Sequence, residues 1–396
     1  MAAAAAGLLW AEVATAQMSH DHGKAQACTP PMIACATKAT PTFAADGTLW
    51  LAWAAGGHVL VASSADLGRS FTSPVAVNAE ALDLDWGPDA RPKIAVDKDG
   101  RVFVAFARFK DRQFNGEVLY SRSTDGGRSF APPRPITTDR QSQRFEAIAL
   151  DSDGSLFAAW LDKRNRVPAR ERNQDYVGAA LAFSWSYDHA TSVSETRIAQ
   201  NNTCECCRLG VAFAGPGRPV VAFRNVFDGT VRDHAITTFV DRATPGPVFR
   251  VSVDDWKTDA CPHQGPSLTI APDGSYHVAW FTNGRVRRGL FYASSTDGGR
   301  TFSPPLPFGR PGASHPNLVA TQGALWLAWK EFDGETTSVV AMVSHDSGHT
   351  WSERKPLART ADTSDHPLLV TNGRNVFLSW QTRTEGYRLI PVENGS

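Results

Sequence analysis

The chain of 396 residues has 40 basic and 40 acidic side chains, so its formal net charge is zero. This balance argues against a nucleic-acid or anionic-membrane partner. No run of 18 apolar residues is present to span a bilayer, and the length suits one large globular domain.

The first 17 residues have the features of an export signal. They are rich in alanine, contain the apolar stretch Leu8 to Trp10, and end in small residues that suit signal-peptidase cleavage after Ala16. The sequence therefore predicts a signal-peptide-like segment at 1–17 and a flexible lead at 18–34, before a single domain at 35–396. Export to a bacterial periplasm, or secretion, is the expected location.

A repeat occupies most of the remaining chain. Seven times, a small residue and a large aromatic close a short apolar run, at Trp53, Phe106, Trp160, Phe223, Trp280, Trp329 and Trp380. A spacing of about 50 residues is typical of β-propellers, in which each repeat forms one four-stranded sheet, or blade. The sequence thus predicts an all-β fold, a seven-bladed β-propeller, with these aromatics in the second strand of each blade.

Turns and strands can be placed within each repeat. Asp-Gly pairs such as Asp46-Gly47 precede the aromatic run and indicate hairpins, because glycine supplies the positive φ of a tight turn. The short apolar stretch upstream, such as 92–96, is interpreted as the innermost strand. The last repeat has only three clear strands, at 367–370, 376–380 and 388–392. We therefore expect residues 31–35 to supply its fourth strand.

A second motif follows the aromatics. Ser64 to Phe71 recurs at 123–130, 295–302 and 344–351, with a degenerate copy at 186–188. It resembles the Asp-box, S-x-D-x-G-x-x-F/W, of the sialidase (BNR-repeat) superfamily. The resemblance implies a turn between the third and fourth strands, on the face away from the active site. The Asp of such a turn accepts hydrogen bonds from its own backbone. Sialidases typically have six blades, so a six-bladed sialidase propeller is the alternative fold.

The same resemblance implies a catalytic set of three arginines that clamp a carboxylate, a tyrosine nucleophile paired with a glutamate, and an aspartate acid/base. In place of the family's first arginine element this chain has Lys38-Ala39-Thr40-Pro41, so the set does not transfer residue by residue. The remaining catalytic candidates are Arg91, Arg144, Arg208, Asp162 and Tyr387. A sialidase-like glycoside hydrolase is therefore an alternative function.

The repeat register places one residue just before each innermost strand: Thr40, Arg91, Phe145, Arg208, Gly265, His315 and His366. Matched positions should converge at one mouth of the central channel, where four consecutive blades present cysteine or histidine. Thiolate and imidazole favour copper or zinc over magnesium or calcium. We expect a transition-metal site, with copper as the metal and zinc as the alternative, formed by Cys204, Cys206, Cys207, Cys261, His263, His315 and His366.

The six cysteines also allow a metal-free interpretation. Cys28 could pair with Cys35, and either a Cys206–Cys207 or a Cys204–Cys261 disulfide could pin the loops near the mouth. The polar loops on this face could hold a protein or small-molecule partner, with the charged insertion at 164–175 as a partial lid. Three functions remain open: metal handling or metal-dependent redox chemistry by an exported propeller, sialidase-like hydrolysis, and a metal-free interaction propeller.

Overall fold

The computed structural model describes residues 32–258 and 260–392. Strands dominate these residues, and the helical elements within them are the 3-10 helix η1 (Ile33–Cys35) and the short helix α1 (Arg166–Glu171). No helix in this part of the chain is long and apolar enough to cross a membrane. The expected signal segment at 1–17 and most of the expected lead at 18–34 lie outside the described residues.

The strands form antiparallel sheets that follow one another along the chain. The first sheet contains β1 (Ala39–Phe43), β2 (Leu49–Ala55), β3 (His58–Ser64) and β4 (Val75–Ala76). The second contains β5 (Leu84–Asp85), β6 (Lys93–Val96), β7 (Val102–Phe109), β8 (Gly116–Ser123) and β9 (Arg134–Pro135). The third run contains β10 (Gln143–Leu150), β11 (Leu156–Asp162), β12 (Ala179–Ser186) and β13 (Arg197–Thr203).

The next run contains β14 (Gly210–Phe213), β15 (Pro219–Phe227), β16 (Val231–Phe239) and β17 (Pro245–Arg250), and the pair Thr203–Asn225 joins it to the third. Another sheet contains β18 (Ser267–Ile270), β19 (Tyr276–Asn283), β20 (Arg288–Ser295) and β21 (Leu306–Phe308). The last two sheets contain β22 (Ala313–Thr321), β23 (Ala324–Phe332), β24 (Thr337–Ser344) and β25 (Lys355–Thr360), then β26 (Leu368–Thr371), β27 (Val376–Thr382) and β28 (Gly386–Pro391).

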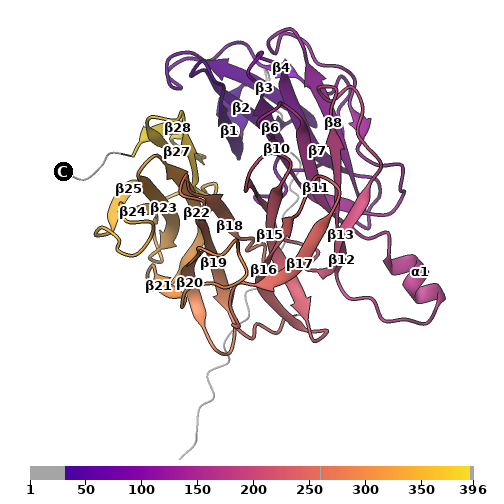
Figure 1. Ribbon diagram of the computed structural model, residues 1–396. Helices are drawn as coiled ribbons and strands as arrows, with labels where there is room; N and C mark the ends of the chain where they lie inside the picture. The colour runs from indigo at the N-terminus through magenta and orange to yellow at the C-terminus, as the bar shows by residue number, and fades with distance from the viewer. Residues whose placement is uncertain (1–31, 259, 393–396) are drawn as a thin grey trace, which may run out of the picture.

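The innermost strands form a closed ring. β1 contacts β6, β6 contacts β10, and the series continues through β14, β18, β22 and β26 back to β1. Figure 1 shows the sheets arranged around a common centre, with the first sheet, in indigo, near the last, in yellow. This radial arrangement of antiparallel sheets is a β-propeller.

The repeated aromatics lie in the hydrophobic layers between neighbouring sheets. Each occupies the second long strand of its repeat, and the exposed fraction of every one is 1% or less. One such layer combines Val59 and Val61 of β3 with Val104 and Phe106 of β7. The predicted second-strand position of the aromatics is therefore confirmed, and these side chains hold adjacent sheets together.

The Asp-box turns connect the third and fourth strands, as the sialidase resemblance implied. In the first copy, Asp66 accepts hydrogen bonds from the hydroxyl of Ser64 (2.8 Å) and the backbone N–H of Ser70 (2.9 Å). The degenerate copy at Asp188 makes the same bonds, at 2.9 and 3.0 Å. Local bonding lowers the pKa of Asp66 to about 2, chiefly through Ser70. The boxes are structural turns at the ends of the third strands.

The expected fourth strand of the last sheet is wrong within the described residues. That sheet contains only β26, β27 and β28, and residues 33–35 form η1, which packs against β28. The N–H of Ala36 bonds to the carbonyl of Ile33 at 3.0 Å. Because this bond closes a 3-10 turn, the segment does not pair with β28 as a strand.

Candidate functional site

The starts of the innermost strands bring distant residues together at the centre of the ring. We call Asp89, Arg91, Arg208, His315, Asp365 and His366 the central cluster. Both Phe145 and His315 lie at strand bulges and have positive φ angles, of 58° and 56°. A bulge re-aims the side chain that it carries. The matched bulges support the register in which these residues were aligned.

A buried ion pair links the second sheet to the last. The guanidinium of Arg91 donates to both carboxylate oxygens of Asp365, at 2.7 and 2.5 Å, and the two side chains are only 5% and 2% exposed. Arg91 also donates to the carbonyl of Ala39 at 3.2 Å, and Asp365 accepts from the N–H of Ala39 at 3.3 Å. Three sheets are thus tied together where the ring closes.

Asp89 makes a second set of contacts across the centre. Its carboxylate lies 3.4 Å from the guanidinium of Arg208 and accepts from the N–H groups of Arg208 (3.3 Å) and Gly265 (3.4 Å). Nδ1 of His366 lies 3.7 Å from the same carboxylate. A Cβ on Gly265 would come within 2.4 Å of Arg208, so this approach requires glycine. Asp89 therefore connects four sheets.

The two predicted histidines meet face to face. The ring centroids of His315 and His366 are 3.4 Å apart, and the ring planes differ by 28°. Burial, together with the nearby cations, holds the pKa of His315 well below its ordinary value, and burial and His315 do the same for His366. Both imidazoles are therefore neutral near pH 7, which is the form that accepts protons or binds metals.

Three half-buried lysines surround this cluster. Burial lowers the pKa of Lys38 and of Lys93 to about 8, and it also lowers the pKa of Lys330. Burial raises the pKa of Glu146 to about 7, and neither of its carboxylate oxygens has a hydrogen-bond partner among the described residues. Among the described residues, none of the three lysines forms an ion pair with the carboxylates of the central cluster. Positive charge is therefore in excess at the centre.

The cysteines form a separate, compact group on the turn that precedes β14. Sγ of Cys204 lies 3.7 Å from that of Cys206 and 3.9 Å from that of Cys207, and all three sulfurs lie within 4.8 Å of one another. They are 1–2% exposed. Cys261 is exposed and its thiol interacts with Cys206. All four are free thiols, so neither proposed disulfide among them is formed; Cys28 lies outside the described residues.

Buried Arg224 and half-buried Arg232 face these sulfurs. Arg224 donates to Cys204 (3.8 Å) and Cys207 (3.5 Å), and Arg232 donates to Cys204 (3.6 Å). The pKa of Cys204 lies well below its ordinary value, chiefly because Cys206 and then Cys207 hydrogen-bond to its sulfur, with a further contribution from the two guanidinium charges. The same sulfur contacts raise the pKa of Cys206.

The predicted ligand set is therefore divided in the structure. Three of the seven residues form the cysteine group, which is the metal-compatible cluster found among the described residues. His315 and His366 belong to the central cluster instead. His263 precedes β18; its ring lies 5.8 Å from that of Phe145, and its backbone hydrogen-bonds to His315.

The sialidase-type candidates are also separated. Arg91 and Arg208 lie in the central cluster, and Arg144 on β10 pairs with Asp85 on β5, in the second sheet, at 2.6 Å. Asp162 is fully buried and accepts from the indole of Trp160 and from Arg164, at 2.9 and 2.8 Å. Tyr387 packs between sheets, with its hydroxyl 3.1 Å from that of Ser379. The arginines approach the centre, whereas the tyrosine does not.

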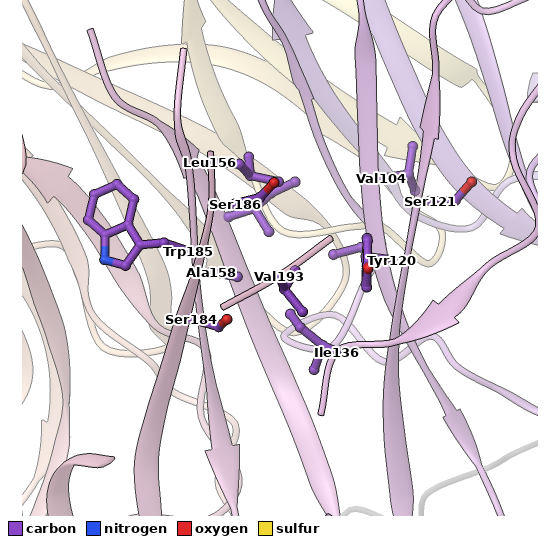
Figure 2. Close-up of a pocket in the computed structure, with 12 residues that line it drawn as sticks. Val104, Tyr120, Ser121, Ile136, Leu156, Ala158, Ser184, Trp185, Ser186 and Val193 are labelled. Carbon is purple, nitrogen blue, oxygen red and sulfur yellow. The ribbon is translucent and has the colours of Figure 1, made fainter. Parts of the chain in front are cut away.

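Three hollows lie away from the central cluster, and one of them, of about 480 Å³, is lined by Arg310 and Glu331. The apolar pocket in Figure 2, between β7, β8, β11 and β12, is lined by residues such as Val104, Ile136 and Leu156 and encloses only about 10 Å³, too little for a ligand. A polar hollow of about 600 Å³ borders α1 and contains Lys163, Arg166 and Arg170. Figure 1 shows α1 at the periphery, so the insertion is not a lid over the centre.

Several site residues were missed from sequence. Asp89 and Asp365 lie one or two positions before the residues that were aligned, and Lys93 and Glu146 lie one or two positions after them. The signal was available in the register, because each flanks a residue already placed at a strand start. Only the fold shows that Asp89 and Asp365 each pair with an arginine from another sheet.

Comparisons with known proteins place the fold. No family model and no curated protein matches the sequence. A polysaccharide lyase of family PL25, an ulvan lyase bound to -[GlcA(1-4)Rha3S]-, superposes with a TM-score of 0.57 at 10% identity, over 90% of this chain and 94% of that one. A protein of unknown function from Dyadobacter fermentans superposes with a TM-score of 0.53 at 17% identity, over 76% of this chain and 92% of that one. The NanB sialidase of Streptococcus pneumoniae superposes with a TM-score of 0.50 at 10% identity, over 90% of this chain and 89% of that one. The chain thus shares the β-propeller fold of this lyase and this sialidase.

Proposed function

We propose that the protein is a seven-bladed propeller of the sialidase superfamily that cleaves an anionic carbohydrate at the central cluster. The ring of innermost strands and the second-strand aromatics support seven blades over the six of sialidases. The four Asp-box copies and the fold shared with a sialidase and a polysaccharide lyase support the superfamily. The proposed activity depends above all on the excess of positive charge at the centre.

The lysines make this centre suited to an anion. Burial is the main cause of the lowered pKa of Lys38, Lys93 and Lys330; Asp365 attracts Lys38 and Lys330, Glu146 attracts Lys93, and Arg91 repels all three. A bound carboxylate or sulfate relieves both the repulsion and the lost hydration. The ulvan lyase is bound to a glucuronate-containing unit, and glucuronate carries such a carboxylate. We therefore propose an acidic sugar as the substrate.

The chemistry that the residues support is acid–base catalysis. His315 is neutral and half-buried, its Nδ1 contacts Ser314 at 2.9 Å, and its ring also hydrogen-bonds to the backbone of His263. In the proposed reaction one ring nitrogen exchanges its hydrogen bond for the substrate and transfers a proton. No tyrosine of the described residues belongs to the central cluster, and Tyr387 packs on Phe71. A tyrosine nucleophile is therefore not available there. We favour elimination at a uronate, in which the lysines neutralise the carboxylate and His315 removes the proton from the carbon beside it. The glycosidic C–O bond on the next carbon breaks as the C=C bond forms, and water supplies the proton of the leaving hydroxyl.

The test is a substrate panel of ulvan, polygalacturonate, chondroitin, heparin and sialyllactose. Elimination creates an unsaturated uronate whose ultraviolet absorbance rises with time, whereas hydrolysis releases a reducing end without it. His315→Ala should lower the rate by about 10²-fold or more, and Lys330→Met should mainly raise KM. The exposed His349, in an Asp-box turn, supplies the matched control, and His349→Ala should leave the rate unchanged. Activity that survives His315→Ala would contradict the assignment.

Transition-metal binding is a second proposed function, with copper as the metal and a role in metal handling or redox chemistry. The observation that favours it is the convergence of three thiols within 4.8 Å. It is tested by elemental analysis of protein purified from its native compartment, with thiol titration before and after reduction. The export expected from residues 1–17 also remains part of this proposal. The redox state of the compartment decides whether the cysteines are free thiols that can bind a metal or form disulfides.

A further inference from the structure

We propose that Cys204, Cys206 and Cys207 bind one Cu(I) ion in a three-coordinate thiolate site in which no histidine is a ligand. This inference rests on the proposed metal-binding function, and it assigns the ligands, the oxidation state and the compensating charges. The argument comes from the spacing of the sulfurs, from buried Arg224 and half-buried Arg232 beside them, and from the position of Cys261.

The sulfur spacing fits a single ion. Three sulfurs around a trigonal ion, with metal–sulfur bonds of about 2.3 Å, lie about 4.0 Å apart. The observed separations from Cys204 are 3.7 and 3.9 Å. A disulfide needs about 2.05 Å between sulfurs. The sulfur–sulfur separations in this turn therefore fit three ligands of one ion and are too long for a disulfide bond.

Neighbouring strands fix this spacing. The N–H of Cys204 bonds to the carbonyl of Arg224 on β15 at 2.8 Å, and the hydroxyl of Thr203 bonds to the carbonyl of Ala179 on β12 at 2.7 Å. Both bonds go to residues in regular strands, and the pair Thr203–Asn225 joins the third and fourth runs of strands beside them. Because Thr203 and Cys204 are held before an ion binds, ordering this end of the turn adds little to the entropy cost of binding.

The buried charges favour a monovalent ion. Arg224 is 1% exposed, donates to the carbonyl of Arg232 and to two sulfurs, and stacks on Trp256 at 4.1 Å. In the described part of the chain, neither Arg224 nor Arg232 forms an ion pair with a carboxylate, so the sulfurs are their anionic partners. Three thiolates with one Cu(I) carry two negative charges, which the two guanidinium groups neutralise. Buried charge is tolerated when it is balanced in this way.

The same charge count disfavours the competing occupants. A divalent zinc ion on three thiolates leaves one buried positive charge, and structural zinc requires a fourth protein ligand. Cys261 does not belong to the group in which all sulfurs lie within 4.8 Å of one another. A disulfide within the trio would leave both guanidinium charges without enough thiolate to balance them. Soft sulfur donors and a monovalent ion together point to Cu(I).

Cys261 has a different part in this proposal. It is exposed, and its thiol interacts with buried Cys206. A surface thiol beside a buried site can receive an ion and pass it inward by ligand exchange. Substituting Cys261 should therefore slow metal uptake without removing the bound ion at equilibrium.

The experiment is anaerobic titration of the reduced full-length protein with Cu(I), in competition with a chromophoric Cu(I) chelator. We expect one Cu(I) per chain with three sulfur neighbours at about 2.3 Å in X-ray absorption. Cys204→Ser or Cys207→Ser should weaken retention at least tenfold. Cys261→Ser and the double variant His315→Ala with His366→Ala should retain the ion. Tryptophan fluorescence of each variant reports whether the propeller is still folded.

The outcomes separate this inference from the function on which it rests. Copper that needs His315 and His366, or a nitrogen ligand in the absorption spectrum, would retain metal binding but overturn the three-sulfur site. Zinc bound by four sulfurs, with Cys261 as an essential ligand, would also overturn the three-sulfur site. The X-ray absorption spectrum of the unsubstituted protein distinguishes three sulfur ligands from four even where a variant unfolds. If the reduced protein binds no metal, both proposals fail.

Discussion

Removing Asp365 should cost a large share of the stability of the ring. Its carboxylate is the buried partner of Arg91 and also accepts from the N–H of Ala39, so Asp365→Ala leaves a guanidinium that is 5% exposed without its counter-charge. Breaking a buried ion pair from one side costs about 3–5 kcal/mol. The effect should be this large because the contact joins the first, second and last sheets, where the chain closes on itself.

The assay is urea unfolding followed by the fluorescence of the twelve tryptophans. In a double-mutant cycle, Asp365→Ala and Arg91→Met are compared with the double variant, which should lose less than the sum of the single losses because it leaves no unpaired buried charge. Lys98→Met, at an exposed pair with Asp99, is the control and should leave the unfolding midpoint unchanged. A loss below about 1 kcal/mol in Asp365→Ala, or strict additivity in the cycle, would refute the closure argument.

Two other changes test the packing and the electrostatics. Trp329→Ala removes a fully buried side chain between sheets and should cost about 3–5 kcal/mol in the same urea assay; a small loss would mean that the layer collapses around the gap. Because the pKa of Glu146 is raised from 4.5 to about 7, the folded protein keeps a proton that the unfolded chain releases between these pH values. The stability of the natural protein should therefore fall, relative to Glu146→Gln, as pH rises through this window, and parallel pH profiles would contradict the assignment.

The repeat pattern predicted most of the architecture because its signals are local. An aromatic in a second strand and an Asp-box turn each depend on residues within one blade, as the bonds from Ser64 to Asp66 illustrate. The register of strand starts is equally informative, since it aligns His315 with His366, and the structure stacks their rings with centroids 3.4 Å apart. The prediction of a fourth strand in the last sheet was wrong for a local reason too, because residues 33–35 form a 3-10 turn.

The composition of the site could not be predicted to the same extent, because its partners come from opposite parts of the chain. Arg91 and Asp365 are 274 positions apart, and Asp89 and Arg208 are 119 apart. Equal spacing in a repeat predicts which residues face the centre but not which of them pair. The ligand prediction merged cysteines and histidines for this reason, and the structure divides them into the cysteine group and the central cluster.

The turn from Cys204 to Arg208 explains why those groups were merged, and it links them physically. Its first four residues supply the three sulfurs, and the fifth supplies the backbone N–H and the guanidinium that contact Asp89. Arg208 also donates to the carbonyl of Pro316, the residue after His315, at 2.8 Å. A displacement of the thiol turn therefore cannot occur without moving a cation that holds the central cluster together. For this reason, activity on an acidic sugar should be measured with the cysteines both reduced and metal-bound, because the cationic centre and the sulfur site share one short stretch of backbone.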